Sequence, residues 1–215
     1  MNTNVKRITM IGMLCAVAFV VMVVGRIPVV MFYKYDPKDV IIALGGFIYG
    51  PMSAFLISLI VSVVEMFTVS DTGWIGLLMN VLASCSFACV AAYIYKKKHT
   101  MKGAVAGLVT GVVTMVLVML LWNYLITPIY MNYPRAAVAE LLLPVILPFN
   151  LLKGTINAAI TMILYKPLVT ALRKANLLEK TEEKVGVKKY IGPALVALVV
   201  LATCIFLAVV LHNSR

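Results

Sequence analysis

The chain has 215 residues, of which 63% are hydrophobic and only 13% are charged, and its mean hydropathy is +1.03. Soluble domains have about half apolar and about one quarter charged residues, so this composition excludes a water-soluble globular protein and indicates an integral membrane protein. The net charge of +11 does not indicate nucleic-acid binding, because the basic residues lie between hydrophobic runs instead of forming one stripe with interleaved aromatic residues. The four cysteines lie inside apolar runs without metal-ligand spacing, and we interpret them as packing residues: Cys15, Cys85, Cys89 and Cys204.

Six hydrophobic runs approach or exceed the roughly 20 residues that a helix needs to cross a bilayer. They cover residues 8–25, 51–67, 73–95, 103–126, 141–164 and 191–211. The first run follows Lys6 and Arg7 as a signal peptide would, but it is long and lacks a clean cleavage site. We therefore expect it to be retained as the first helix.

A shorter apolar stretch at 40–49 follows the pattern of a helix start. Asp36 is the expected N-cap, Pro37 the first helical residue and Asp39 an acid in the first turn, while Gly50 ends the helix. A helix of about 15 residues is only about 22 Å long. It can cross a membrane only when packed among neighbours, and we expect it as the second of seven spans.

The basic residues are distributed unevenly between the loops. With the amino terminus in the cytoplasm, 13 of the 19 Lys and Arg residues lie inside and five outside, as the positive-inside rule predicts. We expect a multi-pass, all-α protein whose carboxyl terminus is extracellular if the last helix spans. The expected parts are a six-helix membrane domain at 1–172, a charged cytoplasmic linker at 173–189 and an additional transmembrane helix at 190–215.

A polar stripe interrupts the sixth of these seven spans. Asn150, Lys153 and Asn157 are spaced i, i+3 and i+7, and therefore share one helix face. A charge at the centre of a membrane helix costs about 2.5–3.5 kcal/mol, so Lys153 needs a partner. That partner is either a ligand, which we favour, or Glu65 in a structural ion pair.

Carboxylates and hydroxyls also gather at the outer end of the third span. Glu65 and Thr68 precede Ser70, Asp71 and Thr72, and together they offer the groups that a polyol would need. The last three residues equally fit a capped turn that starts the next helix.

A third polar place is the expected outer loop at 123–135, which is rich in aromatic and amide residues. Tyr130, Met131 and Asn132 lie between two prolines, which favours a flat apolar wall beside a polar contact. An aromatic belt at the membrane interface would also account for Trp122, Tyr124 and Tyr133. All three places face outward in this topology and could converge on one pocket.

Sequence motifs for catalysis are missing. There is no P-loop and no nucleophile-elbow motif. The two histidines, His99 and His212, lie outside the apolar runs, which argues against a histidine-based enzyme in the membrane. These absences leave ligand binding as the favoured activity.

Four stretches together resemble the riboflavin-specific (RibU-type) S components of energy-coupling-factor (ECF) vitamin transporters. These stretches are 35–51, 64–80, 123–131 and 142–168, within a resemblance that covers about residues 5–172. The resemblance implies a bacterial six-helix membrane protein that captures riboflavin, as transported ligand and not as cofactor, from outside. It also implies docking on a transmembrane coupling subunit with two cytoplasmic ATPase subunits, whose ATP hydrolysis drives the S component to topple in the bilayer.

The resemblance also implies roles for individual residues. A flavin's pyrimidine edge alternates carbonyl acceptors with one N–H donor, which amide and ammonium groups complement. The expected contacts are Asn150, Lys153 and Asn157 at that edge, Tyr130 and Met131 against the ring, and Glu65, Thr68 and Asn132 near the ribityl hydroxyls.

A small-xxx-small face on the first helix is implied as the contact with the coupling subunit. The matching positions are Gly12 and Ala16, with Ala18 nearby, because small side chains let two helices approach closely. An ordinary packing face inside the bundle is the alternative. Two rival functions also stay open: an S component for another vitamin, and a membrane enzyme or assembly protein in which Glu65 and Lys153 form a structural pair.

Overall fold

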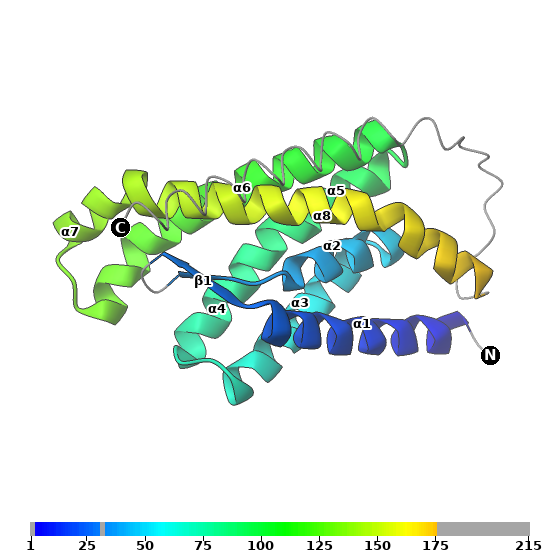
Figure 1. The fold of residues 1–215 in the computed structure, drawn as a ribbon, viewed down its shortest axis with the longest axis horizontal. Coiled ribbons are helices and arrows are strands. Elements are labelled where there is room, and N and C mark those ends of the chain that lie inside the picture. The colour runs from blue at the N-terminus through cyan, green and yellow to red at the C-terminus, as the bar shows by residue number, and fades with distance from the viewer. Residues whose placement is uncertain (1–2, 31–32, 176–215) are drawn as a thin grey trace.

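The computed structural model describes residues 3–30 and 33–175. In chain order its elements are α1 (Thr3–Gly25), β1 (Ile27–Val30), β2 (Tyr33–Tyr35), α2 (Lys38–Tyr49), α3 (Pro51–Thr68), α4 (Gly73–Ser84), the π-helical turn η1 (Cys85–Cys89), α5 (Val90–Lys97), α6 (Met101–Met131), α7 (Arg135–Leu141), the π-helical turn η2 (Leu142–Ile146) and α8 (Leu147–Lys174). The π turns join α4 to α5 and α7 to α8, so the described chain forms six helical segments. The long helices α6 and α8 pack side by side along the molecule, whereas α1 packs on α2 and α3 (Figure 1).

Five helical segments are long and apolar enough to cross a membrane. They are Val5–Gly25, Pro51–Thr68, Gly73–Lys97, Met101–Met131 and Arg135–Leu172. Their positions confirm the first five long runs expected from the sequence. The linker at 173–189 and the last span at 191–211 lie, from residue 176 onward, outside the described residues, and stay predictions.

The short helix α2 is buried among its neighbours, as its length requires. It packs against α1, α3 and α8, and most of its residues are buried. The expected start was wrong by one residue: Pro37 is the N-cap, and no side chain caps the helix. The Asp36 carboxylate instead lies near Lys153. Gly50 ends the helix with φ of 92°, a conformation that glycine adopts at little cost.

The described fold is all-α, as expected, apart from one small antiparallel hairpin. β1 pairs with β2, with Ile27 opposite Tyr35 and Pro28 opposite Lys34. The hairpin lies in the link between α1 and α2, where the sequence predicted only a loop. β-Branched and aromatic residues favour such a ribbon.

Small residues bring the helices of the core close together. A side chain at Gly107 or Gly111 of α6 would collide with the backbone carbonyls of Ala91 and Phe87. α6 therefore packs directly on the backbone of α5 and η1, as membrane helices with small interface residues do. On its other face α6 exposes a stripe of apolar residues spaced four apart, typical of contact with lipid: Val105, Val109, Val113, Leu117 and Leu121.

Candidate ligand-binding site

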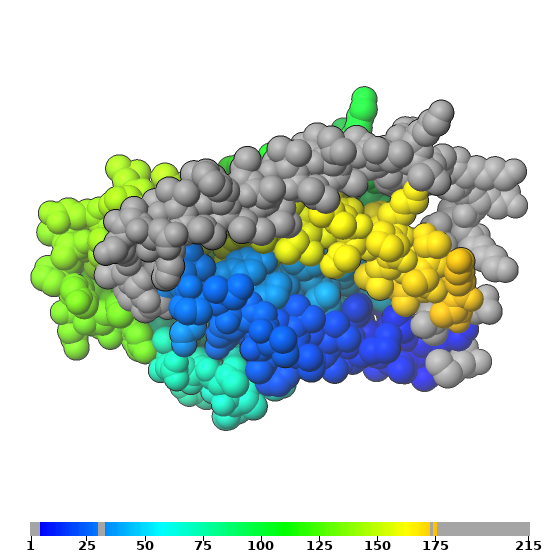
Figure 2. Space-filling view, in the orientation of Figure 1, coloured from blue at the N-terminus to red at the C-terminus, as the bar shows by residue number. Residues whose placement is uncertain are grey.

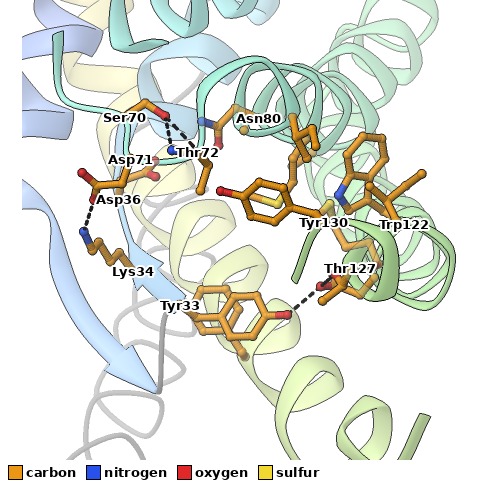
Figure 3. A pocket seen from close by; sticks show the side chains of 18 of the residues that line it. Tyr33, Lys34, Asp36, Ser70, Asp71, Thr72, Asn80, Trp122, Thr127 and Tyr130 are labelled. Atoms are coloured by element: carbon orange, nitrogen blue, oxygen red, sulfur yellow. Dashed lines mark hydrogen bonds and ion pairs between the residues drawn. The ribbon is translucent and has the colours of Figure 1, made fainter. Parts of the chain in front are cut away.

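A cavity of about 380 Å³ lies at the end of the bundle opposite the amino terminus. Its lining comes from the α1–α2 link, the α3–α4 region, α6 and the start of α8. The volume falls in the range of about 300–1,000 Å³ that is usual for small-molecule sites. Figure 3 shows Tyr33, Trp122 and Tyr130 around it, with Thr72 and Asn80 from the α3–α4 side.

One wall of the cavity is apolar and aromatic. Met119, Trp122, Ile126 and Tyr130 recur at helical spacing on the cavity face of α6. Phe149 of α8 lines the same cavity and packs against the Tyr33 ring, with centroids 4.8 Å apart. The wall offers flat surfaces on which a planar ring could pack.

The other wall carries charges that are paired with one another. Lys153 Nζ lies 3.4 Å from Asp39 Oδ2 and 3.9 Å from Asp36 Oδ2. Burial acts to raise the pKa of Asp36, but the positive charges of Lys153, Lys38 and Arg26 outweigh it and hold that pKa below its ordinary value. The Asp36 carboxylate is therefore ionised at neutral pH.

Glu65 joins four elements through one buried carboxylate. It pairs with Arg26 at the end of α1 and lies 2.5 Å from Lys38 Nζ of α2. Asn80 of α4 donates a 3.0 Å hydrogen bond to it. The structural pair with Lys153 that the sequence suggested as an alternative is not the one formed, because Lys153 pairs with Asp36 and Asp39 instead.

The hairpin is held across the cavity end by three consecutive side chains of β2. Tyr33 donates to Asn123 of α6 at 2.6 Å, and Tyr35 donates to Asn157 of α8 at 2.9 Å. Lys34 lies 3.4 Å from Asp71 in the α3–α4 link. Burial raises the pKa of both tyrosines, so their hydroxyls stay neutral donors.

Five of the eight ligand contacts expected from the sequence line the cavity: Glu65, Tyr130, Met131, Asn150 and Lys153. Their role as ligand contacts stays a prediction.

The other three expected contacts do not line it. Thr68 donates to the carbonyl of Val64 and is exposed. Asn132 ends α6 in a left-handed conformation, with φ of 52°. Asn157 is fully buried. Its amide group accepts a hydrogen bond from Tyr35 and donates one to Asp39.

Sequence reasoning missed several residues of the polar wall. Asp36 and Asp39 were read only as a helix start, although both are buried beside Lys153. Arg26 was counted only among the outer basic residues and Asn123 only as part of the polar outer loop at 123–135, yet both line the cavity. Three charged residues within the segment 36–39, next to an apolar stretch, were the signal that could have pointed to buried pairing.

Residues 6–165 match the family described as "ECF transporter, substrate-specific component". The chain belongs to this family. It is 30% identical over 79% of its length to the riboflavin transporter RibU of Staphylococcus aureus, with 93% of that protein covered. It is 28% identical to the riboflavin transporter FmnP of Bacillus subtilis, over 81% of this chain and 99% of that one.

A solved structure supports the same assignment. The structure titled "Structure and mechanism of the S component of a bacterial ECF transporter" superposes with a TM-score of 0.68 at 28% identity, over 79% of this S component and 99% of that chain. The protein is thus a multi-pass membrane subunit of a transporter and not an enzyme. Membership of the family implies an ECF module as partner.

Part of the expected docking face of the first helix lies on the surface of the S component. α1 lies at the molecular surface (Figure 2). Gly12 and Ala16 are exposed, and a Cβ at Gly12 would meet no atom within 4 Å. Ala18 is fully buried in the core, so it is not available to a partner and packs inside the bundle instead.

Proposed function

We propose that this S component captures riboflavin from outside the cell and delivers it inward together with an ECF module. Three curated relatives named riboflavin transporters support riboflavin over another vitamin, at 28–30% identity.

The observation that carries the proposal is the division of the cavity into two walls. Aromatic and apolar residues of α6 face a wall of amide and charged groups that includes Asn80, Asn150 and Lys153. A flavin needs both, because its ring system is flat and largely apolar while its pyrimidine edge and ribityl chain are polar.

The distribution of charge between the two ends of the helix bundle supports a cavity that opens to the outside of the cell. The end that carries the amino terminus holds Lys6, Arg7, the lysines at 96–98, Lys102 and Lys174, whereas the five acidic residues of the described chain lie toward the cavity end. By the positive-inside rule, the basic end is cytoplasmic.

The exposed face of α1 around Gly12 and Ala16 is the proposed contact with the transmembrane coupling subunit. Its support is the open space beside Gly12, since small residues allow a partner helix to approach closely. Two cytoplasmic ATPase subunits would complete the transporter and supply the energy.

Riboflavin binding to the purified protein tests the proposal. We expect a flavin absorbance spectrum or quenching of riboflavin fluorescence on binding, without competition by thiamine, folate or biotin. Tyr130→Ala should weaken binding several-fold, because an aromatic contact is lost from the cavity wall. Tyr133→Ala is the matched control, since Tyr133 is exposed and outside the cavity lining. Protein that ignores riboflavin but binds one of the competitors would overturn the choice of vitamin.

A further inference from the structure

Lys38 and Lys153 are both held by buried carboxylates, but only one of these two lysines reaches the cavity. The Lys38 side chain has no exposed surface and does not line the cavity. The Lys153 side chain keeps 10% of its surface exposed and does line it. Of the two, Lys153 is therefore the lysine that a molecule in the cavity can contact.

The Lys153 ammonium has more donors than its carboxylate partners need. Its Nζ atom lies 3.4 Å from Asp39 Oδ2 and 3.9 Å from Asp36 Oδ2. An ammonium group carries three N–H donors and no acceptor. One N–H for each carboxylate leaves a third, which a hydrogen-bond acceptor of a ligand can take.

Asp39 is the closer of the two carboxylates, and other side chains hold it in place. It is fully buried and does not line the cavity. Ser84 donates to its Oδ1 atom at 2.5 Å, and Asn157 donates to its Oδ2 atom at 3.5 Å. Tyr35 donates to Asn157 Oδ1 at 2.9 Å, which leaves the Asn157 NH₂ group for Asp39. The carboxylate beside Lys153 thus has a fixed position behind the cavity wall.

A lysine in a binding site needs such a support, because its ammonium group lies at the end of a flexible four-carbon chain. A recognition group keeps its geometry only when neighbouring hydrogen bonds hold it. Asp36 lies beyond hydrogen-bonding distance of Lys153, so it attracts the ammonium without fixing its direction. Asp39 is therefore the group that sets where the ammonium points.

We propose that Asp39 is a positioning residue for ligand recognition, which holds the Lys153 ammonium so that its remaining N–H is directed at a carbonyl oxygen of the ligand. This inference rests on the proposed function, in which the carbonyl belongs to the pyrimidine edge of riboflavin. Asp39 acts through Lys153 and does not contact the ligand itself. The sequence had indicated Asp39 only as an acid in the first turn of a helix.

Two riboflavin analogues and two variants test this role. Sulfur, a weak acceptor, replaces one carbonyl oxygen of the pyrimidine edge in the first analogue and the other carbonyl oxygen in the second. Binding is followed by quenching of protein fluorescence, since Trp122 lines the cavity. The proteins compared are the unmodified chain, Asp39→Asn and the control Glu140→Gln, which changes an exposed carboxylate outside the cavity lining.

In the unmodified protein, at least one analogue should bind about tenfold more weakly than riboflavin, because it weakens a hydrogen bond from a charged donor. In Asp39→Asn this ratio of affinities should fall to about threefold or less, because the ammonium is no longer directed at the carbonyl. Glu140→Gln should keep the ratio of the unmodified protein. A purely structural role of Asp39 would lower the melting temperature and leave the ratio unchanged.

The inference is overturned by an unchanged ratio in folded Asp39→Asn, or by an unmodified protein that binds riboflavin and both analogues equally well. If Asp39→Asn does not fold, Ser84→Ala replaces it, since this variant removes a donor that holds Asp39. The ratio should fall there too, and an unchanged ratio overturns the inference. Failure of riboflavin to bind at all would instead overturn the proposed function, so the two failures are distinguishable.

Discussion

Glu65 is the carboxylate on which two of the four buried charge pairs of the described chain converge. It holds Arg26, Lys38 and Asn80, and Lys38 is fully buried. Breaking a buried ion pair by removing one partner leaves an uncompensated charge in a medium that cannot solvate it. Glu65 therefore holds α1, α2 and α4 to α3, and its oxygens are already occupied by protein groups.

Glu65→Gln should lower stability strongly, by about 3–5 kcal/mol, because two cations lose their counter-charge. Thermal unfolding of the purified protein measures this loss. Asp71→Asn is the matched control: the Asp71 side chain is 84% exposed in its pair with Lys34, and an exposed pair contributes only about 0–1 kcal/mol. Similar melting temperatures for the two variants would contradict a structural role for Glu65.

Asn150 and Asn157 share a helix face but have different surroundings. Asn150 lines the cavity, whereas Asn157 is fully buried between Tyr35 and Asp39. Asn157→Leu should reduce thermal stability, because the half-buried Tyr35 hydroxyl loses its acceptor and Asp39 loses one of its donors. Asn150→Leu should mainly weaken riboflavin binding. If Asn157→Leu kept its stability and lost affinity instead, Asn157 would be a ligand contact after all.

The sequence placed Asn150, Lys153 and Asn157 inside an apolar helix, but it did not identify their partners. The cost of a mid-membrane Lys153 showed that a counter-charge was needed. Which carboxylate supplies it depends on where α2 begins relative to α8, and hydropathy carries no information about that approach. Asp36 and Asp39 therefore appeared as a local helix start.

At the scale of the elements, the carboxyl end of α6 also could not be predicted from hydropathy alone. Hydropathy falls at Asn123 and Thr127, so the predicted span ended at 126, yet the helix continues to Met131 with Pro128 inside it. The polar side chains are satisfied within the helix, since Asn123 donates to the Met119 carbonyl and Thr127 donates to Asn123. Segments in the middle of the membrane were predictable because length and apolarity alone define them.

Gly107 lies in a close contact inside the bundle, whereas Gly12 lies on the exposed face of α1. Gly107→Leu should destabilise the fold, because a Cβ there would lie 2.6 Å from the Ala91 carbonyl oxygen of α5. Gly12→Leu should fold normally, since a Cβ at Gly12 meets nothing within 4 Å. It should also bind riboflavin normally but assemble poorly with the coupling subunit. Thermal unfolding, ligand titration and co-purification with the ECF module measure the three effects. Normal assembly of Gly12→Leu would place the contact elsewhere.

At the scale of the whole molecule, the unequal charge of the two ends predicts its orientation. A cysteine introduced at Asp71 should react from outside intact cells with a membrane-impermeant thiol reagent, whereas one at Lys98 should react only after the membrane is opened. Both positions are exposed in the structure, and the cysteines of the described chain lie within its apolar helices. Labelling of both positions, or of Lys98→Cys alone, in intact cells would contradict the proposed topology.

The buried charges around the cavity add up to zero. Arg26, Lys38 and Lys153 are matched by Asp36, Asp39 and Glu65, and the pairs are in direct contact. Displacing one elementary charge through a membrane voltage of 100 mV changes its energy by about 2.3 kcal/mol. A cluster of equal and opposite charges experiences no net force from that voltage. The cavity region and an uncharged cargo could therefore change depth in an energised membrane without electrical work on their net charge.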